Sequence, residues 1–188
     1  MENIDHSGTT RSYAAPNHVV TFRLGNDTFA LPIEPVGQIL PMLAITPLPE
    51  GAGSLVDSLV GAFNLHGRVV PVIDLRRHVR LSCTDLERDT PLIVAHAVDQ
   101  AIGLIVDEVL DVLAVDEADV TPPGDVLPQG MGHAPVLAGL VRLPEMTAGR
   151  FALLLDIDHL FAPEQREALE RAVELLHEQA ATAQAGEQ

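Results

Sequence analysis

The sequence predicts a mainly β protein of two small, similar β subdomains with a C-terminal amphipathic helix, and three observations favour this class. Short stretches rich in Val, Leu and Ile alternate with turn residues, as expected for strands that bury aliphatic side chains. Aromatic residues make up only 3% of the chain and Trp is absent, so aliphatic residues must fill the core. One pattern also occurs twice: Arg68-VVPVI-Asp74 resembles Arg150-FALLL-Asp156, and a short turn follows each. This echo predicts two subdomains that each close on a strand and a helical turn.

The first ordered element is expected to be a β-hairpin that begins near His18. Residues 1–17 are polar and show no period, so we expect a disordered N-terminal tail. Apolar and polar residues alternate from Val20 to Leu24, and the turn residues Gly25-Asn26-Asp27 follow. Residues 34–50 hold four prolines, which forbid a long helix and predict short bent strands at a sheet edge.

Residues 63–78, FNLHGRVVPVIDLRRH, contain His, Gly, Arg and Asp side chains that a catalytic, metal or nucleotide site could use. The plainer interpretation is a buried strand with a turn at each end. Gly67 can adopt the positive φ of a tight turn, and residues 69–73 form a continuous apolar run. Asp74 is a suitable N-cap for one helical turn over the LRRH that follows.

A second set of strands is predicted from residue 91 onward. Its members are PLIVAHAV, AIGLIVDEV, VLAGLVRL and RFALLL. A helix is then expected over residues 163–179, because Pro163 suits a first helical position and Leu169, Ala172 and Val173 fall at helical spacing. Residues 180–188 are expected to form a disordered tail.

Charge and cysteine usage exclude several classes of function. The net charge is −16 and all eleven basic residues are Arg, which argues against nucleic-acid binding and excludes lysine Schiff-base chemistry and a P-loop. Cys83 is the only cysteine, so no intramolecular disulfide forms and a reducing compartment is expected. No apolar run approaches the roughly 20 residues that cross a bilayer. We expect a cytoplasmic protein without direct membrane insertion.

No motif for catalysis, a metal or a cofactor emerges from the sequence. The eight histidines lack ligand spacing, and the acidic clusters lack the pattern of a calcium loop. Ser58 has no identifiable base, and Gly103 lies within a predicted strand rather than a phosphate loop. We therefore expect no catalytic residue, no metal and no cofactor, and a binding protein rather than an enzyme.

Two subdomains present sheet edges and a groove, where partners add strands or lay helices, so an adaptor is the predicted function. Two alternatives stay open from the residues. The edges could simply be covered by the protein's own loops, or the chain could be a regulatory module that binds a small ligand or metal in the cleft between the barrels.

Four segments in order carry a family resemblance: FRLGNDTFALPIEPVGQIL, FNLHGRVVPVIDLRRHV, AIGLIVDEVLDVL, and LAGLVRL followed by RFALLLDIDHLF. Over residues 18–165 they resemble the CheW-like family of bacterial chemotaxis coupling proteins. The resemblance implies two small five-stranded β-barrels, similar to SH3 folds, packed on a shared core. It also implies a non-enzymatic scaffold for signal transduction in receptor arrays. Its partners would be the cytoplasmic tip of a chemoreceptor (a methyl-accepting chemotaxis protein) and the regulatory domain of a CheA-type histidine kinase.

The resemblance further implies a set of partner-binding positions. These are Val36, Gln38, Ile39, Gly61, Asn64, His66, Gly67, Gly103, Asp107 and Val109. Positions 36 and 39 match apolar family positions of the first barrel, positions 61–67 match the G-x-x-N-L-x-G turn, and the last three match the second-barrel motif. Gln38 stands where many members have Glu, and His66 where many have Arg. Loss of this opposite-charge pair suggests a specialised pathway with its own receptor and kinase.

Overall fold

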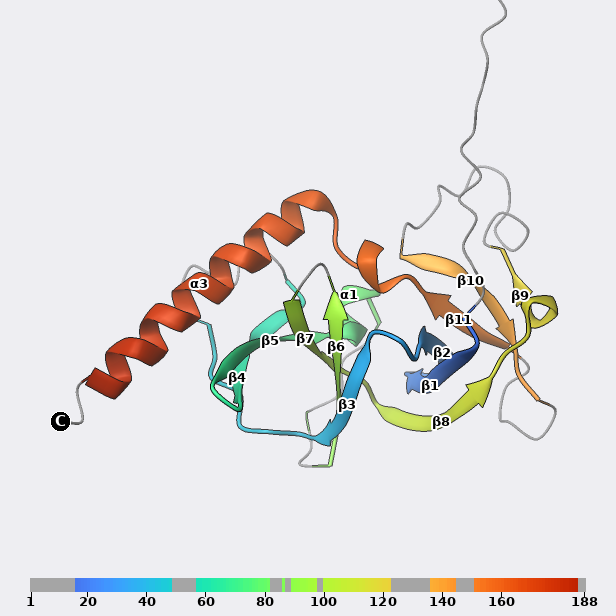
Figure 1. The fold of residues 1–188 in the computed structure, drawn as a ribbon, viewed down its shortest axis with the longest axis horizontal. Helices are drawn as coiled ribbons and strands as arrows, with labels where there is room; N and C mark the ends of the chain where they lie inside the picture. Colours follow the sequence, from blue (N-terminus) through green and yellow to red (C-terminus); the bar gives the residue numbers. More distant parts are fainter. Residues whose placement is uncertain are drawn as a thin grey trace, which may run out of the picture.

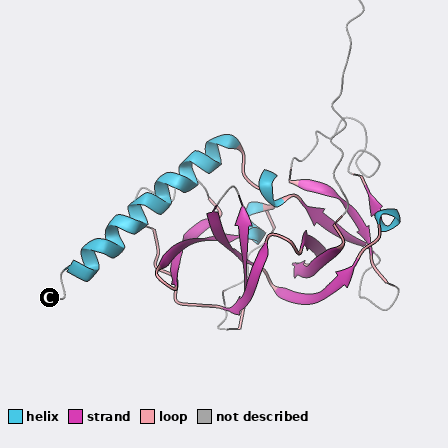
Figure 2. Cartoon of the chain, viewed as in Figure 1, coloured by secondary structure: helices cyan, strands magenta, loops and turns pink. Residues whose placement is uncertain are grey.

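The computed structural model describes residues 16–48, 57–81, 86, 89–97, 100–122, 136–144 and 151–185. Within these ranges the chain forms two β-sheets, and one long helix lies across one end of the molecule (Figure 1). Strands dominate the described structure, as the sequence predicts (Figure 2). Cys83, residues 1–15 of the predicted N-terminal tail and residues 186–188 of the predicted C-terminal tail lie outside the described residues.

Sheet A has the strand order β8-β1-β2-β11-β10-β9, and sheet B has the order β3-β6-β7-β5-β4. The strands of sheet A are β1 (His18–Leu24), β2 (Asp27–Pro32), β8 (Glu108–Ala114), β9 (Val120–Thr121), β10 (Leu137–Arg142) and β11 (Phe151–Leu155). Those of sheet B are β3 (Val36–Pro41), β4 (Leu59–Leu65), β5 (Arg68–Asp74), β6 (Pro91–Ala97) and β7 (Gln100–Ile105). The helical segments are α1 (Leu75–His78), η1 (Glu117–Asp119), η2 (Ile157–His159) and α3 (Pro163–Ala185).

The two sheets share one topology. Hairpin β1–β2 in sheet A corresponds to β6–β7 in sheet B, and hairpin β10–β11 corresponds to β4–β5. In each sheet a parallel pair joins the two hairpins, β2 with β11 and β7 with β5. Strand β8 flanks β1 as β3 flanks β6. Sheet A has one more strand than the five predicted, because the two-residue β9 pairs with β10 where sheet B has only an isolated bridge from Thr46 to Ala62.

The subdomains are not the first and second halves of the sequence. After hairpin β1–β2 the chain crosses to sheet B to form β3, and after hairpin β6–β7 it crosses back to sheet A to form β8. The stretch AIGLIVDEV, expected to be one strand, is therefore divided. Strand β7 ends at Ile105 in sheet B, and β8 begins at Glu108 in sheet A.

Both faces of the central strands are buried because each sheet packs on two apolar clusters. In β1, Val19 belongs to a cluster within sheet A, whereas the adjacent Val20 belongs to a cluster shared by both sheets. In β5, Val72 faces a cluster within sheet B and Ile73 faces the shared one. This alternation places one apolar cluster within each sheet and one between the sheets, and it agrees with the predicted mainly β fold of two subdomains on a shared core.

The repeated sequence pattern corresponds to a repeated local structure. Asp74 ends β5 and caps α1, where its carboxylate accepts a hydrogen bond from the Arg76 amide at 3.0 Å. Asp156 follows β11 and caps η2, where it accepts from the Asp158 amide at 3.1 Å. Each subdomain thus closes on a buried strand and an Asp-capped turn, as predicted.

Helix α3 covers the shared core at the sheet B end of the molecule. Ala168, Leu169 and Ala172 are buried in the shared cluster, and the helix contacts β4 and β5. The remainder of the helix runs away from sheet A (Figure 1). It continues to Ala185, past the expected end at residue 179, so residues 180–185 are helical where a tail was expected.

Candidate partner-binding surface

Strand β3 forms one edge of sheet B and carries three of the predicted partner-binding residues. Its side chains alternate between half-buried and exposed positions. Ile39 is 42% exposed and is one of three large apolar side chains exposed on the described strands, with Val112 and Phe151. Gln38 is half-buried, and Val36 packs against the shared core. Ile39 is therefore the apolar member of this group that a partner can reach.

The β4–β5 turn presents three more of the predicted residues. His66 and Gly67 both have positive φ, 51° and 86°, as two-residue hairpin turns of type I′ require. The Asn64 side-chain oxygen accepts a hydrogen bond from the Gly67 amide at 2.7 Å and fixes the turn. All three residues are exposed, so the turn offers His66 to a partner on a rigid support.

Gly61 and Gly103 are buried and shape the sheet without reaching its surface. A Cβ at Gly61 would lie 2.3 Å from the Thr46 carbonyl oxygen, so only glycine lets residues 45–46 close against β4. A Cβ at Gly103 would lie 3.1 Å from the Phe63 ring. Both positions support the candidate surface through packing, and neither offers a side chain to a partner.

Asp107 and Val109 lie where the chain crosses from sheet B to sheet A. Asp107 is 26% exposed and accepts a hydrogen bond from the Gly25 amide at 2.6 Å. Val109 is half-buried and packs against the shared core. The predicted residues that reach the surface thus lie at three places: edge strand β3, the β4–β5 turn next to the opposite edge of sheet B, and the partly exposed crossover.

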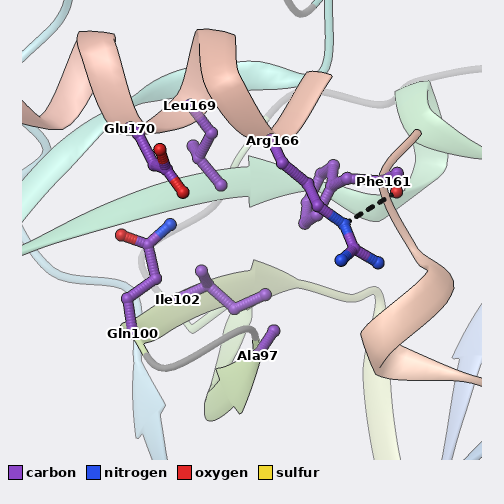
Figure 3. A pocket seen from close by; sticks show the side chains of 7 residues that line it. All are labelled: Ala97, Gln100, Ile102, Phe161, Arg166, Leu169 and Glu170. Carbon is purple, nitrogen blue, oxygen red and sulfur yellow. Dashed lines mark hydrogen bonds between the residues drawn. The ribbon is translucent and has the colours of Figure 1, made fainter. Parts of the chain in front are cut away.

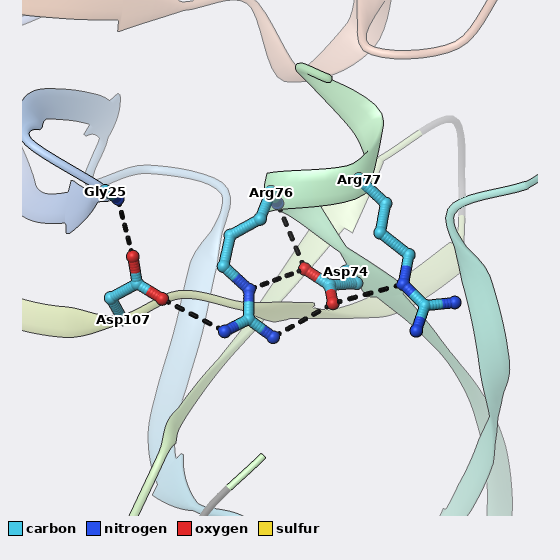
Figure 4. A network of polar contacts seen from close by, with 5 residues as sticks. All are labelled: Gly25, Asp74, Arg76, Arg77 and Asp107. Carbon is cyan, nitrogen blue, oxygen red and sulfur yellow. Dashed lines mark hydrogen bonds and ion pairs between the residues drawn. The ribbon is translucent and has the colours of Figure 1, made fainter. Parts of the chain in front are cut away.

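A buried polar network next to the crossover was not anticipated from the sequence (Figure 4). The Arg76 side chain is 2% exposed, and its Nε and Nη2 atoms each donate to the Asp74 carboxylate at 3.0 Å. Its Nη1 donates to Asp107 at 3.2 Å. The hydrogen bonds and charge of Asp74, aided by Asp107, raise the pKa of Arg76 against the opposing effect of burial. The DLRR motif predicted the helix cap at Asp74, but nothing in it indicated that the Arg76 side chain points into the protein.

The structure also corrects the expectation that Ser58 has no base nearby. His78 Nδ1 lies 3.0 Å from Ser58 Oγ, and His78 Nε2 lies 2.6 Å from the Leu160 carbonyl oxygen. Because a carbonyl only accepts, Nε2 carries the proton and Nδ1 accepts from the serine. Ser58 is only 3% exposed, so a substrate cannot reach this pair. It instead ties α1 to the segment before α3, where Phe161 packs edge-on against His78.

A pocket lies between α3 and hairpin β6–β7 (Figure 3). Ile102, Phe161 and Leu169 form its apolar lining, and Arg166 and Glu170 stand at its rim. The Arg166 guanidinium donates to the backbone carbonyls of Phe161 and Asp158. Among the described residues, no group of three or more His, Cys, Asp or Glu side chains could hold a metal ion.

The order and spacing of these elements match a known family. Residues 18–165 match the model of the CheW-like domain. The chain belongs to the CheW-like family. This match includes both sheets and every predicted partner-binding residue, and it ends at the start of α3. The predicted assignment as a chemotaxis coupling adaptor is confirmed.

Individual CheW relatives agree with this assignment. The chain is 27% identical to chemotaxis protein CheW of Rhizobium meliloti, covering 80% of this chain and 90% of that one. It is 29% identical to chemotaxis protein CheW of Treponema pallidum, with 80% and 85% coverage. The crystal structure of scaffolding protein TtCheW from Thermoanaerobacter tengcongensis superimposes with a TM-score of 0.65 at 26% identity, covering 78% of this chain and 93% of that one.

No helix in the described part of the chain is long and apolar enough to span a membrane.

Proposed function

We propose that this CheW-like protein works in the cytoplasm and couples chemoreceptors to a CheA-type histidine kinase. The observation that carries the proposal is the exposed Ile39 on edge strand β3, within a CheW-like domain that spans residues 18–165. An edge strand has unpaired backbone groups on one side, and an exposed apolar side chain beside them gives a partner area to bury. We assign no catalytic step to this surface.

We divide these surface positions into two groups, because an adaptor holds two partners. We assign β3 and the β4–β5 turn to the regulatory domain of the kinase, because an edge strand can pair with another β domain. We assign the crossover around Val109 to the receptor tip. The two groups are linked through sheet B, since β7 leads directly to the crossover.

The kinase-binding group has no charged pair at the positions where many family members carry one. Gln38 and His66 replace those charges on β3 and on the β4–β5 turn. Apolar contact through Ile39 and polar contacts from Asn64 and His66 must then supply the affinity. We infer a dedicated kinase whose matching surface also lacks the opposite-charge partners, because an unpaired charge buried there would weaken binding.

Calorimetric titration with the regulatory domain of the CheA-type kinase from the same genome tests this surface. We expect micromolar binding, and we expect Ile39→Asp to weaken it at least about tenfold because a charge in a desolvated interface has no compensation. Leu175→Asp is the matched control, since Leu175 on α3 is 44% exposed and lies outside the family domain. Equal binding by wild type and Ile39→Asp would remove β3 from the interface. No binding by the wild type would refute the proposed partner.

A further inference from the structure

The buried network around Arg76 joins two elements that lead to the partner-binding groups: strand β5, which begins at the β4–β5 turn, and the crossover between the sheets. Asp74 is the last residue of β5, whose hairpin carries the β4–β5 turn in sheet B. Asp107 lies between β7 of sheet B and β8 of sheet A. The Arg76 guanidinium donates to both carboxylates, so it connects the end of the hairpin to the crossover (Figure 4).

Asp107 extends this connection into sheet A. One carboxylate oxygen accepts from Arg76 Nη1 at 3.2 Å, and the other accepts from the Gly25 amide at 2.6 Å. Gly25 lies in the β1–β2 turn and has a φ of 61°. The Asp107 amide in addition donates to the Arg23 carbonyl at 3.0 Å. A continuous line of hydrogen bonds therefore runs from the end of β5, through Arg76 and Asp107, to the turn of the first hairpin.

The chemistry of the network suits a fixed junction better than a contact surface. Arginine presents a planar fork with five donors, which lets it hold one carboxylate with two atoms and a second carboxylate with a third. Asp74 is 1% exposed and Arg76 is 2% exposed, so water competes little for these bonds. Both oxygens of Asp107 already accept hydrogen bonds within the protein, although a quarter of its side chain is exposed.

We propose that Arg76 and Asp107 are positioning residues that hold the β1–β2 turn, the crossover and the end of β5 as one rigid unit. This inference rests on the proposed function, because the unit contains the crossover assigned to the receptor and the end of the strand that leads from the β4–β5 turn assigned to the kinase. It assigns Asp107 a role different from direct partner contact. Because the unit is rigid, a shift that one partner imposes on its group is passed on to the other group, so that binding of one partner favours binding of the other.

Asp107→Asn tests the proposal with little change of volume. The asparagine amide has a single acceptor oxygen, so either Gly25 or Arg76 loses its acceptor while Asp74 still neutralises Arg76. Glu108→Gln is the matched control. It removes the same charge at the next residue, from an ion pair with Arg23 whose side chains are 43% and 54% exposed. Arg76→Lys is the second variant, because lysine keeps the charge and lacks the planar fork.

Two readouts separate positioning from general stability. Hydrogen exchange followed by NMR is expected to show the Gly25 amide exchanging about tenfold faster in Asp107→Asn, and within about twofold of wild type in Glu108→Gln. Affinity for the kinase regulatory domain is measured with and without a receptor cytoplasmic fragment. Asp107→Asn and Arg76→Lys are expected to bind the kinase domain alone within about twofold of wild type, and to lose at least about fivefold of the enhancement that the receptor fragment gives.

The outcomes distinguish this inference from the proposed function. If the wild type shows enhancement and Asp107→Asn keeps all of it, the positioning role is overturned while the adaptor function stands. If Asp107→Asn alters the affinity for the kinase domain alone as much as the enhancement, Asp107 is a contact residue and the positioning role is likewise overturned. If the wild type binds neither partner, the proposed function fails, and this inference fails with it.

Discussion

At the scale of single residues, glycines set how closely the backbone can pack in the two subdomains. Gly61 in β4 and Gly139 in β10 occupy corresponding places, and each sits at a shift of strand register. A Cβ at Gly139 would lie 2.6 Å from the Thr121 carbonyl oxygen, much as a Cβ at Gly61 would meet Thr46. Both glycines permit a neighbouring segment to pair with the outer hairpin, so each subdomain depends on one.

Gly61→Ala is expected to lower the free energy of unfolding by about 1–3 kcal/mol, because the added methyl group overlaps backbone atoms that cannot move aside freely. Gly67→Ala is the comparison. It also has positive φ, but nothing lies within 4 Å of its added methyl, so a smaller loss of about 1 kcal/mol is expected. Urea denaturation of both variants measures the difference. A loss at Gly67 as large as that at Gly61 would contradict the packing argument.

His78 provides a pH dependence of stability. Burial lowers its pKa from the usual value of 6.5, and the hydrogen bond to the Leu160 carbonyl offsets this only in part. Below pH 6.5 the unfolded chain therefore binds a proton that the folded protein does not yet bind. The stabilisation is fully present above this pH and is lost as pH falls towards the lower pKa of the folded state.

Melting temperatures measured between pH 7.5 and pH 5.5 test this dependence. The wild type is expected to lose stability towards pH 5.5, and His78→Gln is expected to lose less over the same range because the titrating group is gone. His18→Gln, at an exposed position on β1, is the matched control and should keep the wild-type slope. Parallel slopes for all three proteins would show that His78 does not account for the dependence.

At the scale of elements, α3 packs against the shared core and covers part of it. The family domain ends at residue 165, yet the buried positions of the helix lie at Ala168, Leu169 and Ala172. Core side chains that the family domain alone would leave open are therefore covered by this helix. The helical spacing of Leu169, Ala172 and Val173 predicted an amphipathic helix here, although not how far the helix continues.

Leu169→Ala is expected to lower the free energy of unfolding by about 2–5 kcal/mol, because it opens a cavity in the shared core. Leu175→Ala on the same helix removes the same atoms from a side chain that is 44% exposed. We expect this substitution to change the free energy of unfolding by less than about 0.5 kcal/mol. Chemical denaturation measures both. Similar small effects would mean that α3 is not an integral part of the core.

Local sequence patterns predicted most helices and strands. The predictions failed where tertiary contacts determine whether a strand forms or where it ends. Hairpin β1–β2, strand β5 and the cap at Asp74 followed from alternation and turn residues. Strand β4 was not expected, because Gly61 and Asn64 weaken its pattern. The break after Ile105 was also missed, since the apolar run continues through Val106 while the chain changes sheets.

At the scale of the whole molecule, the exchange of β3 and β8 between the sheets could not be predicted from the sequence. Strand β2 pairs in parallel with β11, whose residues lie more than a hundred positions further along the chain. The sequence pattern within either strand does not indicate this pairing. The exposure of the predicted partner-binding residues could not be predicted from the sequence either. The family resemblance indicated its positions, but only the structure separates exposed Ile39 from half-buried Val36 and from buried Gly61 and Gly103.

Reconstitution can show whether this protein places the activity of a kinase under the control of a receptor. Kinase autophosphorylation would be measured on vesicles that carry the chemoreceptor, with wild type, with Ile39→Asp and with Leu175→Asp. We predict that receptor ligand controls kinase activity with wild type and Leu175→Asp, and that control is lost with Ile39→Asp or without the protein. Ligand control of equal strength in the protein's absence would contradict the adaptor role, and ligand control of equal strength with Ile39→Asp would contradict the role of β3 in it.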